Sequence, residues 1–164
     1  EELAMVGVSA ITASDNRWLS CDIKAISLLP NVLLRQKAVE SNATETVLLR
    51  DGFLTEGSAS NIFIVKDKLL LAPPKSNLML PGITYDVILE LAEKYKIAHE
   101  VRDISENDLR SSDEILLTSS TKEIMPIIFL DGKKIGGGKP GDIFKNLYRH
   151  YQDFKVAIMR ENLL

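Results

Sequence analysis

The sequence has little cysteine and no long uninterrupted hydrophobic run. Its 164 residues contain one cysteine, Cys21, so an internal disulfide is excluded, and a free thiol fits a reducing compartment such as the cytoplasm. The longest apolar stretches, such as residues 124–130, are far shorter than the roughly 20 residues that cross a bilayer. We therefore expect a cytoplasmic protein without a membrane partner.

A surplus of positive charge is also absent. Twenty lysines and arginines stand against 23 aspartates and glutamates, which gives a net charge of -3. Because proteins that bind nucleic acid need a basic surface, nucleic acid is not an expected partner. The two histidines, His99 and His150, lie far apart in the sequence and have no cysteine at ligand spacing, so no metal site is expected.

The composition, with 45% hydrophobic and 26% charged residues, is that of one globular domain. Segments typical of strands and of helices alternate, and no linker rich in Ser, Pro or Gly divides them. We therefore predict a single domain over residues 1–164. The chain opens with Glu1 and has no initiator Met, which predicts that it was cut from a longer protein.

Hydrophobic periodicity and turn residues predict the secondary structure. The expected strands are residues 3–12, 99–103 and 114–120, a meander of four short strands over 45–72, and a hairpin over 125–135 that turns at Asp131-Gly132. The expected helices begin near Pro30, Gly82 and Pro140, and a short one is capped by Ser105. This mixed order predicts an α/β fold with a partly antiparallel sheet.

Lys24 is the first candidate for chemistry, because it stands in CDIKAISLLPNVLL among residues that would normally be buried together. Burial lowers the pKa of a lysine and makes its amine nucleophilic, as carbonyl chemistry through a Schiff base requires. The alternative is a lysine at the end of a strand whose ammonium group reaches water. The local pattern does not decide between the two.

Three further segments suggest a ligand site. Glu56 ends a strand in FLTEGSASNIF, where it could hold a proton on a ring nitrogen or be an ordinary turn residue. In LPGIT, residues 80–84, the amides that begin a helix could bind an anion or only water. The three hydroxyls of residues 119–121 could add donors to the same anion or cap the next segment.

Taken together and in this order, these segments resemble the large domain of the class IV aminotransferases, which use pyridoxal phosphate. Residues 17–36 are similar to the segment around the family's cofactor lysine, and residues 55–63, 69–74 and 80–84 to its glutamate and phosphate-loop signature. LLTSSTKEIMPI, residues 116–127, resembles its later strand. The resemblance implies that family's fold, an α/β domain whose mixed sheet is partly closed into a barrel with flanking helices.

The resemblance also implies roles for the residues around the cofactor ring. Lys24 would be the lysine that forms the Schiff base and moves the proton of the substrate's Cα. Glu56 would hold the protonated pyridine nitrogen, which keeps the ring able to withdraw electrons. Leu80 would press on the face of the ring away from the lysine, and Arg17 would approach the phenolic oxygen.

At the other end of the cofactor, the resemblance assigns the phosphate to main-chain amides and hydroxyls. Ile83 and Thr84 would bind it through their amides, and Ser120 and Thr121 would add hydroxyl groups. The implied substrates are an amino acid and a 2-oxo acid, and the implied assembly is a homodimer.

Within the family, the run from Arg17 to Asn31 most resembles D-amino-acid transaminases, so we expect transfer of an amino group between a D-amino acid and a 2-oxo acid. Branched-chain aminotransferases are an alternative from which Leu28-Leu29 departs, and aminodeoxychorismate lyases are another. Four positions depart from the D-amino-acid pattern: Ser20, Ala25, Ala59 and Tyr85. A third alternative is an inactive fragment or a non-catalytic assembly module.

Family members carry an N-terminal small domain of about a hundred residues, a usual domain size, and this chain lacks it. The resemblance implies that the small domain supplies the arginine that clamps the cofactor phosphate and the side chains that hold the substrate carboxylate. We therefore expect this chain alone to bind pyridoxal phosphate poorly and to turn over slowly or not at all.

Overall fold

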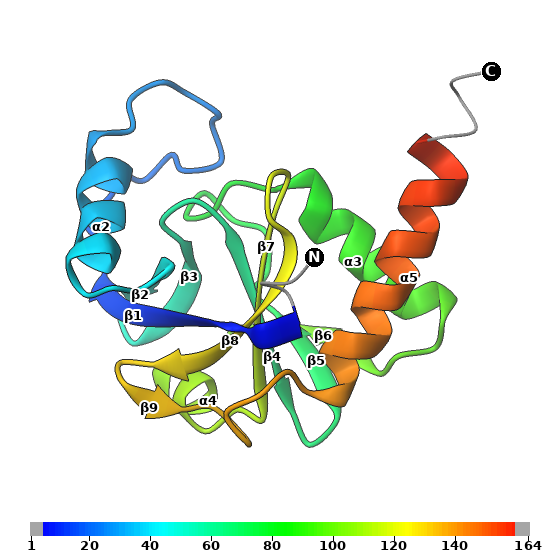
Figure 1. Cartoon of the computed structure of the whole chain (residues 1–164). Coiled ribbons are helices and arrows are strands. Elements are labelled where there is room, and N and C mark those ends of the chain that lie inside the picture. The colour runs from blue at the N-terminus through cyan, green and yellow to red at the C-terminus, as the bar shows by residue number, and fades with distance from the viewer. Residues whose placement is uncertain (1–4, 160–164) are drawn as a thin grey trace.

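The computed structural model describes residues 5–159 as one curled sheet with helices around it (Figure 1). The strands are β1 (Val8–Ser14), β2 (Glu45–Arg50), β3 (Phe53–Gly57), β4 (Asn61–Lys66), β5 (Leu69–Ala72), β6 (His99–Val101), β7 (Glu114–Ser119), β8 (Glu123–Leu130) and β9 (Lys133–Lys134). The helices are α2 (Leu29–Glu40), α3 (Ile83–Lys94), α4 (Glu106–Arg110) and α5 (Asp142–Met159). The predicted strand 3–12 starts outside the described residues, and its described part contributes to β1.

The sheet has nine strands in the order β3-β2-β1-β8-β7-β4-β5-β6, and β9 pairs with β8. It is mixed: β1 runs parallel to both β2 and β8, and β5 runs parallel to β6, whereas the other pairs are antiparallel. The strands curl into a half-barrel, as Figure 1 shows. The predicted α/β fold with a partly closed mixed sheet is therefore confirmed.

The predicted four-stranded meander over residues 45–72 is wrong. It divides into two hairpins, β2-β3 and β4-β5, and β3 ends one side of the sheet while β4 lies between β7 and β5. Strand β4 is buried from Asn61 to Val65, as expected for a strand covered on both faces. Such a strand is most stable in the interior of a sheet. Residues 58–60 therefore connect β3 at the edge of the sheet to β4 in its interior.

Two hydrophobic cores lie on opposite faces of the sheet. Helices α3 and α5 pack against each other and over β7, and they bury a cluster that includes Phe63, Tyr85, Leu116 and Phe144. The second cluster lies under the curl of the sheet beside α4 and includes Ile104. Because alternate side chains of a strand point to opposite faces, one apolar strand such as β7 supplies both cores.

Local signals fix several element ends as predicted. The hydroxyl of Ser105 accepts a hydrogen bond from the amide of Asp108 at 3.1 Å and caps α4. Asp131 and Gly132 have positive φ values of 49° and 74° and turn the β8-β9 hairpin. Within residues 5–159, none of the helices combines the length and the hydrophobicity that a bilayer crossing needs.

Replacement of Phe144 by alanine should destabilise the fold strongly, because the ring is fully buried between α5 and the sheet. We expect a loss of about 3–5 kcal/mol in the free energy of unfolding, measured by denaturant titration. Phe53→Ala is the matched control, since that ring is 47% exposed and should cost about 1 kcal/mol or less. Equal losses in the two variants would contradict the assignment of the core.

Candidate functional site

Two adjoining cavities open between the segment 17–31 and the ends of the central strands. The smaller has a volume of about 100 Å³ and the larger about 560 Å³, which lies in the range of small-molecule sites. Both cavities are lined by Lys24, Glu56 and Leu80, which the sequence singles out separately. The topology therefore brings the candidate lysine and the candidate carboxylate to one cleft, although 32 positions separate them.

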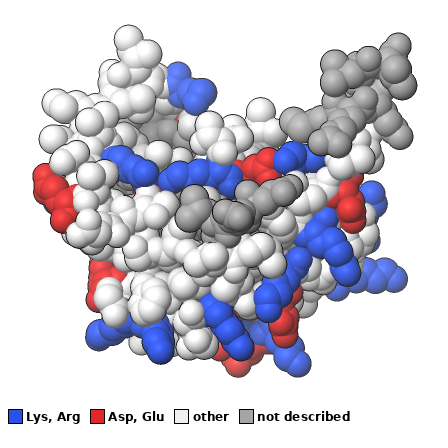
Figure 2. All heavy atoms as spheres, in the orientation of Figure 1, with Lys and Arg blue, Asp and Glu red and all other residues white. Residues whose placement is uncertain are grey.

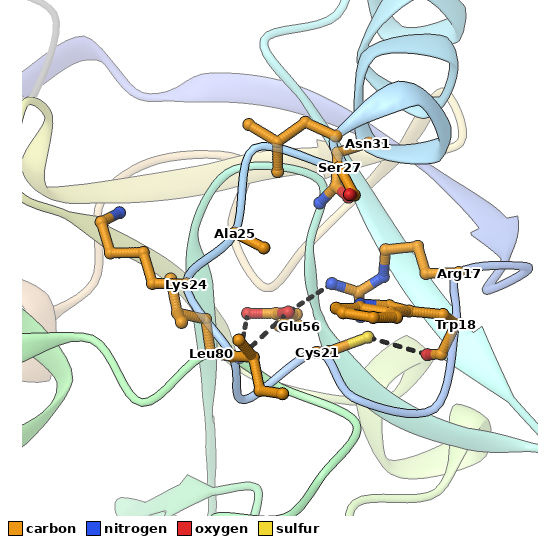
Figure 3. Close-up of a pocket in the computed structure, with 11 residues that line it drawn as sticks. Arg17, Trp18, Cys21, Lys24, Ala25, Ser27, Asn31, Glu56 and Leu80 are labelled. Carbon is orange, nitrogen blue, oxygen red and sulfur yellow. Dashed lines mark hydrogen bonds and ion pairs between the residues drawn. The ribbon is translucent and has the colours of Figure 1, made fainter.

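Glu56 lies near the end of β3, and only 5% of its surface is exposed. Its carboxylate accepts a hydrogen bond from the Leu80 amide at 3.2 Å and another from the Asn61 side chain at 3.3 Å. Arg17 forms an ion pair with it through Nη1 (Figure 3). A buried carboxylate at the wall of a cleft, held by three donors, can serve as a fixed negative charge for a ligand.

Arg17 is itself buried and is held from behind by Asp15. Its Nε and Nη2 atoms donate to the two oxygens of Asp15, each at 2.9 Å. Asp15 also accepts from the hydroxyl of Thr55 at 2.9 Å and pairs with Arg50 at 3.1 Å. The result is a buried network of two carboxylates and two guanidinium groups, with Glu56 at its cavity end.

The surroundings shift the pKa values of the two carboxyl groups in opposite directions. Burial raises the pKa of Glu56 from 4.5 to about 7, against the lowering effect of the Arg17 charge. Burial also acts to raise the pKa of Asp15, but the hydrogen bonds and charge of Arg17 outweigh it and bring that pKa to about 2. Asp15 is therefore a permanent anion at neutral pH, whereas Glu56 can exchange a proton there.

Lys24 is exposed, so of the two possibilities that the sequence leaves open, the structure shows the one in which the amine reaches water. The segment between β1 and α2 has no regular structure and projects from the sheet (Figure 1), so its apolar side chains are not packed inside the chain. Ile26 is 98% exposed and Ile23 56%. In Figure 3 the Lys24 side chain extends along the cavity with its amine directed away from Glu56.

The larger cavity continues from Glu56 to the start of α3. Gly82, the N-cap residue of α3, lines it, and a Cβ there would collide with Asn61 Oδ1. Ser120 and Thr121 line the same cavity, and Thr118 places there a buried hydroxyl without a hydrogen-bond partner. An open helix start, exposed hydroxyls and an unsatisfied donor together suit an anion.

Ile83 and Thr84, the predicted phosphate-binding residues of α3, lie beside this end of the larger cavity and do not line it. Ile83 and Thr84 are the first residues of α3, where helix amides have no partner within the helix. The Ile83 side chain is 79% exposed, and that of Thr84 is buried and hydrogen-bonds Tyr151. Their contribution to an anion would come from the main chain. Arg17 lines the smaller cavity only.

Sequence reasoning missed Glu45, which organises one wall of the larger cavity. This fully buried carboxylate accepts hydrogen bonds from the Ser58 amide at 3.1 Å, from the Ser60 hydroxyl at 2.8 Å and from the Ser58 hydroxyl. Ser58 and Ser60 both line the cavity. An acidic residue opening the apolar strand TVLL was the signal, but its partners are 13 and 15 positions away.

Metal chemistry finds no support in the described part of the chain, where no three His, Cys, Asp or Glu side chains group as metal ligands. Figure 2 shows basic and acidic side chains interspersed over the face that it presents. The site is characterised by its lysine, its buried carboxylate and an end whose donors suit an anion.

The raised pKa of Glu56 predicts a pH dependence of stability. Between 4.5 and about 7 the folded chain holds a proton on Glu56 that the unfolded chain has lost, so stability falls as pH rises through this window. The decline should be on the order of 3 kcal/mol. In Glu56→Gln, denaturant titrations across the window should lack this part of the decline. Glu93→Gln, at a carboxylate 82% exposed, should keep it; equal pH profiles for the wild type and Glu56→Gln would contradict the prediction.

Comparison with known proteins agrees with this arrangement. A family model described as amino-transferase class IV matches residues 3–128. A D-alanine aminotransferase of Bacillus licheniformis is 43% identical over 147 residues, which cover 90% of this chain and 52% of that protein. A D-alanine aminotransferase of Staphylococcus aureus (strain MSSA476) is 39% identical over 148 residues, again 90% and 52%. The chain spans about half the length of the curated relatives it matches.

Solved structures show the same fold. A branched-chain amino acid aminotransferase of T.th., solved with pyridoxamine 5'-phosphate, has a TM-score of 0.87 at 28% identity over 93% of this chain and 52% of that one. That of Thermoproteus uzoniensis, solved with norvaline, has a TM-score of 0.87 at 27% identity over 94% and 53%. Since the family model matches most of the sequence and these neighbours share the curled sheet, the chain belongs to the class IV aminotransferases.

Proposed function

We propose that this chain is the cofactor-holding part of a pyridoxal phosphate-dependent aminotransferase that moves an amino group between a D-amino acid and a 2-oxo acid. The observation that carries the proposal is that Lys24 and Glu56 line the same two cavities, which Leu80 lines as well. An amine that can condense with a carbonyl and a carboxylate that can face a ring nitrogen are the two groups that this chemistry needs from the protein.

The residues present fit pyridoxal phosphate at both ends. At the phosphate end, the buried hydroxyl of Thr118 and the N-terminus of α3 offer donors that have no partner among the described residues, and Gly82 lets Asn61 approach the backbone where a side chain would collide. Ser120 and Thr121 would add hydroxyls, and Ile83 and Thr84 main-chain amides. At the ring end, the buried carboxylate of Glu56 suits a protonated ring nitrogen.

Pyridoxal phosphate, when bound, supplies a carbonyl for the amino group and a ring that withdraws electrons from Cα. Lys24 would hold the cofactor through Nζ and, once released, would accept the Cα proton of the amino acid and pass it on within the same half of the exchange. In the second half it would supply a proton to the carbon of the 2-oxo acid that becomes Cα. Its exposed position leaves the amine free to move between these tasks. Glu56 would keep a negative charge beside the ring nitrogen, and Leu80 would exclude water from one ring face.

The D-amino-acid preference is supported by the relatives' names. The curated D-alanine aminotransferases are 39–44% identical to the chain over at least 88% of it, whereas the branched-chain enzymes are 27–28% identical. A branched-chain aminotransferase is the second candidate, because those enzymes share the fold at a TM-score of 0.87. The lyase and the non-catalytic module have no observation of their own in their favour.

A homodimer, a separate N-terminal small domain and a cytoplasmic location belong to the same proposal. The support for a covering partner is a run of large apolar side chains that this chain leaves exposed between β1 and α2. They are Trp18, Leu19, Ile23, Ile26, Leu28 and Leu29, each at least 48% exposed. The free thiol of Cys21 fits a reducing compartment.

Replacement of Lys24 should abolish covalent capture of the cofactor. The chain is incubated with an excess of pyridoxal phosphate and reduced with borohydride, which fixes a carbonyl compound to the amine that has condensed with it. Mass spectrometry should place the cofactor on the peptide that contains Lys24, and Lys24→Ala should lose that label. Any transamination should fall by a factor of about 10² or more, because the group that moves the proton is gone.

Lys37→Ala is the matched control, since that lysine is exposed on α2 outside the cavities and its loss should leave the label in place. Equal labelling of Lys24 and Lys37 peptides would remove Lys24 from the proposed chemistry. We expect the label on this chain to need cofactor well above stoichiometric amounts, because the chain spans about half the length of its curated relatives and the phosphate clamp implied by the resemblance would lie in the other half.

The substrate class is tested on the full-length protein with D-alanine and with L-leucine as amino donors and 2-oxoglutarate as acceptor. Formation of pyruvate from D-alanine at a higher kcat/KM than turnover of L-leucine is the expected result. A preference for L-leucine would favour the branched-chain candidate, and pyruvate release from an aminodeoxychorismate-like substrate without any acceptor would favour a lyase.

A further inference from the structure

The guanidinium group of Arg17 is almost fully committed within the protein. Of its five N–H groups, two donate to Asp15, one to the main-chain oxygen of Leu78 at 3.0 Å and one to Glu56. The side chain is 3% exposed. One N–H group is left for a ligand, so Arg17 is built chiefly to hold protein carboxylates.

Asp15 fixes the direction in which Arg17 points. Its two oxygens accept Nε and Nη2 side by side, a two-point contact that leaves Nη1 aimed at Glu56. Asp15 is held in turn by the Arg17 amide at 3.1 Å and the Thr55 hydroxyl at 2.9 Å. Arg50 donates to the Arg17 carbonyl oxygen at 2.8 Å, so the main chain at this point is clamped as well.

The charges around Glu56 balance within the site. Asp15 and Glu56 carry two negative charges when ionised, and Arg17 and Arg50 carry two positive ones. The titratable Cys21 lines the same cavity, and burial raises the pKa of its thiol, so it stays neutral near pH 7. Lys24 lines the cavity on its open side. Without Arg17, Glu56 would therefore be a buried anion without the ion-pair partner that the described residues give it, and the like charge of Asp15 would still disfavour its ionisation.

We propose that Arg17 is a positioning residue, locked by Asp15, that fixes the buried Glu56 carboxylate at the wall of the cavity and lowers its affinity for a proton. The geometry gives it this role through one guanidinium group that makes two hydrogen bonds to Asp15 and an ion pair with Glu56. Its effect on a ligand is indirect, because it acts through the carboxylate.

The proposal deepens the proposed function, on which only its last step rests. A carboxylate that stays ionised can stabilise a positive charge on a ring nitrogen, whereas a protonated carboxyl cannot. Arg17 would thus set the fraction of molecules ready to receive a protonated ring. The Glu56 carboxylate, held by Arg17, would bind the cationic group of a different ligand in the same way.

The test is an NMR titration of Glu56 in the chain without cofactor. Side-chain carboxyl carbons are labelled with ¹³C-glutamate, and the Glu56 signal is identified by its loss in Glu56→Gln. In Arg17→Gln we expect the proton affinity of Glu56 to rise tenfold or more, because an opposite charge at contact distance is removed from a buried carboxylate. Arg149→Gln, the same change at an exposed arginine on α5, should leave the titration unchanged.

A folded Arg17→Gln chain in which Glu56 titrates as in the wild type would overturn the proposal. If that variant does not fold, Arg17→Lys decides the question: lysine keeps the charge but cannot bind both carboxylates as a fork, so the affinity should rise by about threefold or more. An unchanged titration in a folded Arg17→Lys chain would overturn the proposal too. Because no cofactor is used, the result stands whether or not Lys24 condenses with pyridoxal phosphate.

Discussion

The site depends on one constraint: a carboxylate buried at the end of a strand needs a counterion and hydrogen-bond donors to offset its loss of water. Glu56 obtains them from a neighbouring turn, from β4 and from a segment preceding α2. Each donor belongs to a different part of the chain, so the carboxylate ties these parts together. The segments that supply hydrogen bonds to Glu56 also form the walls of the cleft, so the need to pair this buried carboxylate shapes the cleft.

The order of the strands explains why these parts meet. Placing β4 beside β7 sets Asn61 opposite Thr118, and the same register carries the hydroxyl-bearing turn 119–121 to the start of α3. The strand pair β2-β3 brings Glu45 beneath Ser58 and Ser60. Two carboxylates, Glu45 and Glu56, thus hold the two sides of one loop, and the larger cavity lies over it.

Local features of the fold were predictable from the sequence, and long-range ones were not. The Ser105 cap and the Asp131-Gly132 turn follow from a few adjacent residues. The ion pair of Arg17 with Glu56 spans 39 positions, and no pattern of spacing encodes it. The apolar run around Lys24 left burial of the amine undecided, because composition shows only that such residues favour burial and not whether this chain or another covers them. Residue type and local context marked Lys24, Glu56 and residues 80–84 and 119–121 as candidates, but their roles came from the resemblance, since hydrophobic periodicity does not mark an active site.

The projecting segment before α2 joins two properties that are usually separate. Its isoleucine and leucine side chains are largely exposed, with Ile26 almost wholly in solvent, and Lys24, the proposed cofactor lysine, lies among them. Efforts to keep a concentrated solution clear by inserting polar groups there would alter the entrance to the cleft. The solubility of the chain and its proposed chemistry therefore depend on the same segment, residues 17–31, so changes made for one will affect the other.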